Sequence, residues 1–325
     1  MLRRKHLFFD DAGGTLDHTG PSAYLLMKAL GTGGPVSSVP VVPAARREAI
    51  SAALRATPVG QPRLMGILNA TPDSFHAASR VQGETAVRRG LAMLDAGATW
   101  VDVGGESTRP GATPVAVEEE VERVVGVLEE LRKARPDAFL SVDTRRVEVA
   151  RAALMAGADL INDVSGLRDP AMRELVLASG CGVCIMHMRG EPASMQHNID
   201  YEDVVDEVHG TLHATALALV EDGHPSGLIC LDPGIGFGKE HAHNLELLQA
   251  GDALGEDGRW SVLWGVSRKS VVGVLTGHAD SNQRLAGTLG LAAVATKAGV
   301  DLLRVHDVQE HVDLLAAMAP FDLKA

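Results

Sequence analysis

The chain has 325 residues and 46% of them are hydrophobic, enough to bury the core of one large domain. Its formal net charge of −12 argues against a general nucleic-acid binder, because neutralising phosphates requires a basic face. No apolar run approaches the roughly 20 residues of a membrane span, and three cysteines cannot form a disulfide framework. Since the N-terminus has no apolar segment of secretory length, we expect a cytoplasmic protein.

Residues 1–60 differ in composition from the rest of the chain. They carry a formal charge of +3, and glycine, proline and serine interrupt residues 31–43, which disfavours a helix there. A helix is predicted for residues 43–55, with Pro43 in its first turn. We expect residues 1–60 to form an extension that packs on the bottom or the side of a catalytic domain of residues 61–325.

From residue 64 onward, short apolar runs alternate with segments of helical periodicity. Runs of four to six residues are typical of parallel strands buried on both faces. Eight such units over about 255 residues match the size of a (β/α)8 TIM barrel, which is the predicted fold. The predicted strands are 64–69, 100–103, 139–143, 159–163, 182–186, 227–232, 262–265 and 301–306. The predicted helices are 84–96, 117–133, 147–156, 171–178, 201–221, 244–250, 283–298 and 309–318.

Seven motifs lie at or just after the predicted strands. They occupy residues 66–75 (GILNATPDSF), 102–111 (DVGGESTRPG), 141–144 (SVDT), 161–163 (IND), 231–239 (LDPGIGFGK), 267–270 (SRKS) and 304–307 (RVHD). In this order they resemble the dihydropteroate synthase family, from about residue 64 to residue 318. The resemblance implies a barrel enzyme that joins 6-hydroxymethyl-7,8-dihydropterin pyrophosphate to 4-aminobenzoate, releases pyrophosphate and uses Mg²⁺. It also implies a homodimer and a target for sulfonamides.

The candidate pterin site lies at the ends of the third to sixth strands. Asp143 and Asp232 each end an apolar strand, and a buried carboxylate there needs hydrogen-bond donors. A pterin supplies them through its 2-amino group and N3–H, while Asn162 can bind the remaining edge of the ring. We expect Met186 to pack on the pterin face and Phe237 to lie beside the ring.

The candidate anion site follows the last two strands, where barrel enzymes recurrently bind phosphate. Arg304 and His306 are two residues apart on an extended segment and so share one face. By resemblance, Arg304, His306 and Asn69 hold the pyrophosphate, with Asn69 also near Mg²⁺. Ser267 lines the 4-aminobenzoate position, and Lys269 lines both substrate positions.

The loop after the second strand supplies Thr108 and Arg109 near the pyrophosphate and the amine substrate, again by resemblance. Because no obvious nucleophile or strong base accompanies these residues, we expect a dissociative step. The pterin C–O bond weakens, a cation develops, and the neutral arylamine attacks. Lys269, Arg304, His306 and Arg109 are the predicted catalytic residues, acting through charge and positioning.

One segment departs from the family pattern. After Phe75 the family usually continues Ser-Asp-Gly-Gly, whereas this chain has HAASR at residues 76–80. This change puts in doubt how the first loop orders around Mg²⁺ and 4-aminobenzoate. It leaves open a pterin-binding paralogue with weak or no turnover. A pterin-binding, folate-dependent methyltransferase also stays open, because it could use the same pocket of Asp143, Asn162 and Asp232.

Overall fold

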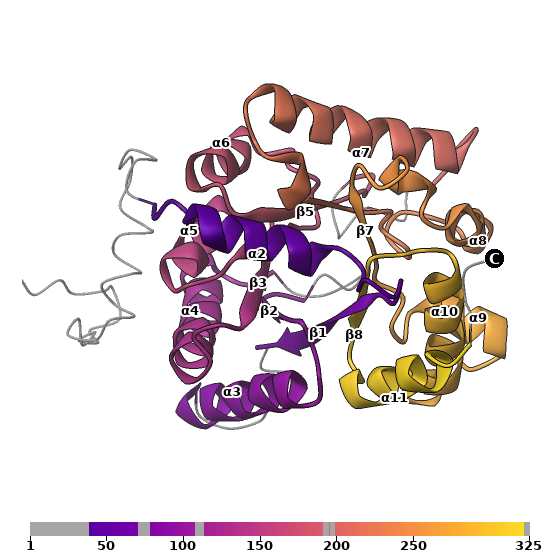
Figure 1. Ribbon diagram of the computed structural model, residues 1–325, viewed down its shortest axis with the longest axis horizontal. Helices are drawn as coiled ribbons and strands as arrows, with labels where there is room; N and C mark the ends of the chain where they lie inside the picture. Colours follow the sequence, from indigo (N-terminus) through magenta and orange to yellow (C-terminus); the bar gives the residue numbers. More distant parts are fainter. Residues whose placement is uncertain (1–38, 71–78, 108–113, 191–194, 196–198, 322–325) are drawn as a thin grey trace, which may run out of the picture.

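The computed structural model describes residues 39–70, 79–107, 114–190, 195 and 199–321 (Figure 1). Eight parallel strands pair in chain order, and the eighth pairs with the first, so the sheet closes into a barrel. The strands are β1 Arg63–Asn69, β2 Trp100–Gly104, β3 Phe139–Asp143, β4 Leu160–Asp163, β5 Gly182–Met186, β6 Ile229–Asp232, β7 Ser261–Trp264 and β8 Leu302–Val305. The predicted (β/α)8 barrel is confirmed.

Helices surround the barrel and cover the outer face of the strands (Figure 1). They are α3 Ser79–Asp95, α4 Val117–Ala134, α5 Val147–Met155, α6 Pro170–Ser179, α7 Val204–Glu221, α8 His241–Ala250, α9 Ser270–Thr276, α10 Leu285–Lys297 and α11 Val308–Met318. The core between strands and helices is aliphatic, as expected for parallel strands buried on both faces.

Several predicted boundaries are wrong by two to five residues: the helices predicted from 84, 201 and 244 begin at Ser79, Val204 and His241. Two others have a clear local reason. The sixth strand begins only at Ile229, because residues 226–228 form a 3₁₀ turn closed by the Leu228 N–H on the Pro225 carbonyl. The predicted helix 283–298 begins at Leu285, after a separate 3₁₀ turn over residues 281–283 that is capped by Asp280. The seven-residue helix α9 was not predicted at all, because two turns give no clear helical periodicity.

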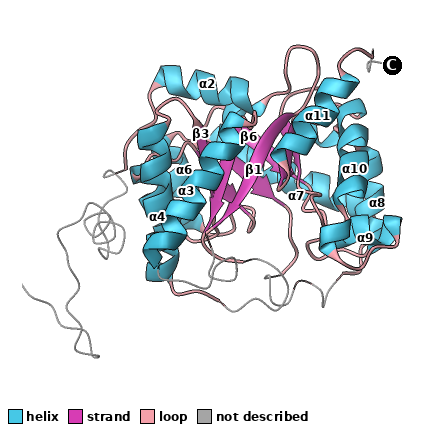
Figure 2. Cartoon of the chain, turned by 90° about the horizontal axis from the view of Figure 1, so that it is seen from below, coloured by secondary structure: helices cyan, strands magenta, loops and turns pink. Residues whose placement is uncertain are grey.

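Helix α2 (Ala44–Leu54) lies across the N-terminal end of the barrel, opposite the end where the strands finish (Figure 2). Pro43 is the residue before this helix rather than part of its first turn. Ile50 and Leu54 are fully buried and join a cluster with the side chains that fill the bottom of the barrel. That cluster also contains Ala53, Met65, Trp100, Leu160, Cys184, Leu228, Cys230, Leu263 and Leu302.

Polar contacts fix α2 at this end as well. The Trp100 indole N–H donates to the Ala53 carbonyl over 2.9 Å, inside the core. Arg46 makes a two-pronged ion pair with Asp159, with both distances 2.7 Å. Arg55 donates to the carbonyl of Trp260, just before β7. The helix of the N-terminal extension therefore completes the barrel core.

Leu54→Ala is expected to lower the free energy of unfolding by about 2–5 kcal/mol, because it leaves a cavity among fully buried side chains. Chemical denaturation measures this loss. Val59→Ala, at a residue that is 74% exposed in the following turn, is the matched control and should change stability by less than about 0.5 kcal/mol. Equal stabilities for the two variants would contradict a core role for α2.

Candidate active site

Arg304 on β8 lies at the centre of a network of ion pairs inside the C-terminal end of the barrel. Its Nε donates to Asp102 Oδ2 over 2.6 Å, and one of its Nη atoms donates to Asp143 Oδ2 over 2.5 Å. Asp102 is fully buried and also accepts from Ser141 Oγ at 2.5 Å and Asn162 Nδ2 at 3.0 Å. Burial by itself lowers the pKa of Arg304, but the two carboxylates outweigh it and raise that pKa above its usual range.

Asp143 keeps one oxygen that none of the described residues binds. Its Oδ1 is buried and has no hydrogen-bond partner in the part of the chain that the structure describes, while Oδ2 pairs with Arg304. Burial raises the pKa of Asp143 to about 7, although the charge of Arg304 opposes the shift. Leaving a buried acceptor unsatisfied costs about 1–3 kcal/mol, so this oxygen is poised to accept a hydrogen bond from a bound molecule.

Asp232 lies at the end of β6 and is 5% exposed. Its Oδ1 accepts the Gly234 N–H at 2.7 Å, which fixes the orientation of the carboxylate. Burial raises the pKa of Asp232, and the nearby Lys269 opposes this. Lys269 Nζ donates to the Ile235 carbonyl at 2.6 Å and lies 4.5 Å from the centre of the Phe237 ring, and burial lowers its pKa to about 8.

Met186 and Phe237 belong to one small apolar cluster at the same end of the barrel. Val164, Met188 and Met195 complete the buried part of the cluster, and Phe237 packs against it. The structure thus brings together an apolar, sulfur-rich surface and the carboxylates of neighbouring strands. A flat heterocycle with donor groups on its edge matches this combination.

The loop after β6 is held by a buried lysine that the sequence analysis did not single out. Lys239 Nζ lies 3.1 Å from the carbonyls of Gly234 and Phe237 and 3.1 Å from His187 Nδ1. Burial lowers the pKa of Lys239 to about 7 and that of His187 to about 3, so the imidazole is neutral and accepts from the amine. Gly234 has φ +67°, and a Cβ there would lie 1.9 Å from the His187 carbonyl, so only glycine fits.

Ser267 and His306 form a pair beside this network. Ser267 Oγ is 2.9 Å from His306 Nδ1 and also accepts the backbone N–H of His306 at 3.2 Å. The hydroxyl can donate to Nδ1 or accept from it, depending on the tautomer of His306, and in either case it fixes the ring. Arg268, the residue after Ser267, has φ +58° and turns away to an ion pair with Asp307 at 2.5 Å.

Asn69 ends β1 next to Gly104, the last residue of β2. A Cβ on Gly104 would lie 3.7 Å from Asp143 Oδ2 and 3.9 Å from Asn69 Oδ1, so these two oxygens flank the same space. Amide and carboxylate oxygens are the donors that Mg²⁺ prefers. The residues at this rim therefore fit the metal that the sequence analysis expects.

Thr108 and Arg109 lie outside the described residues, as does the altered segment 76–78. The described residues on either side of Thr108 and Arg109 are nevertheless tied together. Glu106 Oε1 pairs with Arg146 at 2.8 Å and accepts the Val115 N–H at 3.0 Å. One carboxylate thus joins the start and the end of the loop predicted to carry Thr108 and Arg109.

Asp102 is the functional residue that the sequence analysis missed. It belongs to the DVGGESTRPG motif, yet it was assigned no role because it lies within a strand rather than after one. The available signal was its charge, because an acid inside an apolar parallel strand needs buried partners. Its partners come from β3, β4 and β8, which local sequence patterns do not connect.

Comparison with known proteins places this architecture in a family. The family of pterin binding enzymes matches residues 65–306. The fold and the site thus define a pterin-binding enzyme. The dihydropteroate synthase of Escherichia coli is 41% identical over 260 residues, which cover 79% of this chain and 90% of that protein. The dihydropteroate synthase of Xanthomonas albilineans, solved with 4-aminobenzoic acid, is 44% identical with a TM-score of 0.74, covering 81% of this chain and 94% of that one.

A probable bifunctional folylpolyglutamate synthase/dihydropteroate synthase of Haloferax volcanii is 44% identical over 250 residues. Those residues cover 77% of this chain but only 29% of that relative, so the chain spans under a third of it. The chain belongs to the dihydropteroate synthase family, and is therefore a transferase of folate biosynthesis. Within the residues that the structure describes, no helix has both the length and the apolar character needed to span a bilayer.

Proposed function

We propose that this chain condenses 6-hydroxymethyl-7,8-dihydropterin pyrophosphate with 4-aminobenzoate to give 7,8-dihydropteroate and pyrophosphate. The main observation in support is that buried carboxylate oxygens, which accept hydrogen bonds, lie at the same end of the barrel as an apolar surface. The free oxygen of Asp143 and the fixed carboxylate of Asp232 face donors on a ring, while Met186 and Phe237 contact its face. The amide of Asn162 binds the remaining pterin edge, and Asp102 holds that amide in place.

The chain's basic residues act on the leaving group. Arg304, His306 and Arg109 bind the diphosphate and neutralise the charge that grows as the C–O bond breaks. Lys269 lies between Asp232 and Phe237, where it orients the pterin. Ser267 Oγ contacts His306 Nδ1 at 2.9 Å and so helps to fix the orientation of the ring. The arylamine then attacks as the neutral nucleophile, so the reaction requires no covalent intermediate with the protein.

We further propose that Asn69 helps hold Mg²⁺, together with diphosphate oxygens. The metal would supply charge neutralisation at the leaving group. The amide oxygen of Asn69 supports this choice, since it is a hard donor at the rim of the site; the Asp143 oxygen on the same side, Oδ2, is paired with Arg304. A cytoplasmic location and sensitivity to sulfonamides stay predictions. Competition between a sulfonamide and 4-aminobenzoate in the steady-state assay tests the second.

We propose a homodimer that pairs through the outer face of α9 and α10. Val274 and Leu275 on α9 and Val294 on α10 are each about half exposed, at 57%, 50% and 49%. Apolar side chains gathered on neighbouring helices favour burial against another copy. Light scattering on the purified chain measures the mass, and Val294→Asp should shift it to that of a monomer.

The test of the reaction is a pyrophosphate-release assay on the purified chain. Release is expected only when the pterin pyrophosphate, 4-aminobenzoate and Mg²⁺ are all present. Equal release without the arylamine would identify a pterin pyrophosphate hydrolase instead. Pterin binding with no release would favour the non-catalytic paralogue, and methyl transfer from a folate would favour the methyltransferase.

Affinity for the pterin is expected to fall below pH 7, by up to about tenfold per pH unit, because the pKa of Asp143 is about 7 and Arg304 occupies Oδ2. Protonation therefore places an O–H on Oδ1, where a donor then meets the donors of the pterin. Calorimetry at several pH values measures this affinity. The ligand is 6-hydroxymethyl-7,8-dihydropterin without its diphosphate, so that protonation of the diphosphate does not contribute. Unfolding does not explain the loss: folding raises this pKa above its ordinary 3.8, so protonation of Asp143 favours the folded state as pH falls from 7 to 4. In Asp143→Asn the fall in pterin affinity below pH 7 should disappear. If the fall is unchanged in this variant, another group causes it.

A further inference from the structure

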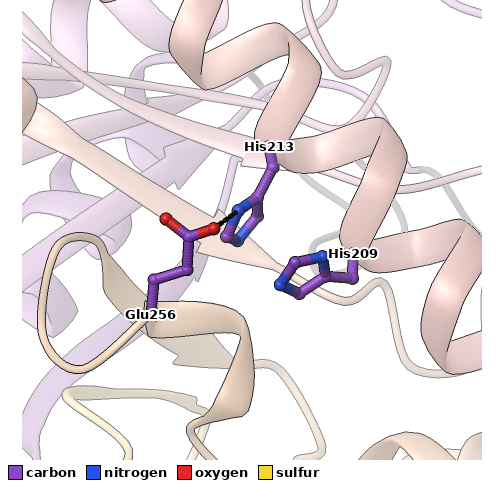
Figure 3. A group of neighbouring side chains, drawn as sticks. All are labelled: His209, His213 and Glu256. Carbon is purple, nitrogen blue, oxygen red and sulfur yellow. Dashed lines mark hydrogen bonds and ion pairs between the residues drawn. The ribbon is translucent and has the colours of Figure 1, made fainter.

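Two histidines and a glutamate form a cluster far from the strand ends that carry the pterin site. His209 and His213 lie one turn apart on the same face of α7, and Glu256 comes from the segment between α8 and β7 (Figure 3). One ligand atom from each residue lies within 4.8 Å of the other two. Glu256 precedes the start of β7, so the cluster is near the N-terminal end of that strand.

Both ring nitrogens of His213 face hydrogen-bond acceptors. A neutral imidazole carries one N–H and can donate to only one of them. Nε2 is 2.7 Å from the Leu254 carbonyl, and Nδ1 is 2.7 Å from Glu256 Oε1 (Figure 3). A carbonyl oxygen can only accept, so Nε2 carries the proton of the neutral imidazole. The lone pair of Nδ1 then faces a carboxylate. A positive charge has to lie on or between these two atoms, either a proton or a metal ion.

The surroundings of His213 match those of a metal ligand. Its side chain is only 6% exposed, and its ring meets the Trp260 ring edge-on at 6.2 Å between centres. Metal-binding histidines almost always donate the other ring N–H to a backbone carbonyl or a carboxylate, which fixes the tautomer. The hydrogen bond to Leu254 does this here, and directs Nδ1 to the outside, where Glu256 is 37% exposed.

His209 adds a second nitrogen on the exposed side of His213. The two rings are stacked, with centres 3.8 Å apart and planes 25° from parallel. A single proton on His213 Nδ1 balances the Glu256 carboxylate but does not involve His209. A single divalent ion can accept both lone pairs once the half-buried His209 ring rotates about its side-chain bonds.

We propose that His209, His213 and Glu256 bind one divalent transition-metal ion of the Zn²⁺ class, with water completing the coordination. Two imidazoles and one carboxylate suit Zn²⁺, whereas Mg²⁺ prefers oxygen donors alone. The site joins α7 to the segment before β7. It is separate from the Mg²⁺ position near Asn69 and does not depend on the proposed function.

Arg259 is the charged group that opposes this ion. Its Nη1 lies 3.3 Å from Glu256 Oε2, the oxygen that faces away from His213, and its guanidinium covers the Trp260 ring. Oε1 therefore keeps its lone pairs for the metal. Arg259 is positively charged and 45% exposed. Its removal should therefore strengthen binding of the proposed metal ion.

The test uses the tag-free full chain, in excess Mg²⁺, titrated with Zn²⁺ by calorimetry and with Co²⁺ by visible absorption. One equivalent is expected to bind, and Co²⁺ should quench the fluorescence of the adjacent Trp260. His209→Ala and Glu256→Gln should each weaken binding at least about tenfold, whereas Arg259→Gln should strengthen it. His278→Ala, at an exposed histidine after α9, is the matched control and should bind like the parent.

Two results would overturn the proposal. One is the absence of stoichiometric binding in the parent chain. The other is binding that His209→Ala and Glu256→Gln leave unchanged, since this would place the ion elsewhere. Pyrophosphate release in Mg²⁺ and the circular dichroism spectrum show that each variant is folded, because none of these residues lies in the proposed active site.

Discussion

Arg304→Ala is expected to lower kcat/KM by more than about 10²-fold and the free energy of unfolding by about 3–5 kcal/mol. Both effects follow from its position between two acids. Asp102 is fully buried, and the Asp143 side chain is 11% exposed, so removing the guanidinium leaves two buried carboxylates without the cation that bonds to both. Steady-state kinetics and urea denaturation measure the two losses. The diphosphate ester should lose more affinity than the bare pterin alcohol.

A double variant separates the roles of Arg304. Adding Asp102→Asn to Arg304→Ala removes one of the uncompensated charges, so it should restore part of the stability while activity stays low. Arg304→Lys keeps the charge but cannot bond both carboxylates with one planar group, and it should lie between the parent and the alanine variant. If the alanine variant is as stable as the parent, the ion-pair network does not contribute to the fold.

Asp232→Asn is expected to weaken pterin affinity by about 10²-fold or more with little change in the fold. The Gly234 N–H donates to Oδ1 at 2.7 Å, so the amide of an asparagine keeps its oxygen there and turns its NH₂ group to the substrate side. Donors on the pterin then meet a donor. Each hydrogen bond left unmade costs about 1–3 kcal/mol. Calorimetry with the pterin alcohol measures the effect directly.

Asp301→Asn is the control for this prediction. Asp301 is another carboxylate next to a strand, but it lies at the N-terminal end of β8 and accepts the N–H groups of Ala56 and Val262. Its replacement should lower stability and leave pterin affinity unchanged. A similar loss of affinity in both variants would mean that Asp232 acts through the fold rather than on the ligand.

The strands could be predicted from sequence because a buried parallel strand has a strong local signal. The ranges 139–143 and 182–186 match β3 and β5 without error. The errors occurred where local chemistry competes with apolar character. Leu228 is as apolar as a strand residue, yet it forms a 3₁₀ turn after Pro225. The short helix α9 gave no periodic signal, because seven residues make only two turns.

The site was predictable where its residues end strands and not where they meet across the barrel. Asp143 and Asp232 could be chosen because polar residues follow apolar runs. Arg304, by contrast, was predicted to bind a diphosphate, and that role stays a prediction. In the structure it pairs with Asp102, 202 positions away in the chain. Closure of the barrel creates that pairing. Thr108 and Arg109 stay predictions.

Helix α2 has a consequence for how the chain folds. Its partners are spread along the chain. Ala53 accepts the Trp100 indole N–H 47 positions on, whereas Arg55 bonds to the Trp260 carbonyl 205 positions on and Ala56 bonds to Asp301, 245 positions on. Such long-range closures are slow, because their loop entropy is lost before the contacts form. Ile50 and Leu54 share a buried cluster with Leu263 of β7 and Leu302 of β8, so full burial of the helix requires the last two strands. We expect its final docking to be among the slow steps of folding.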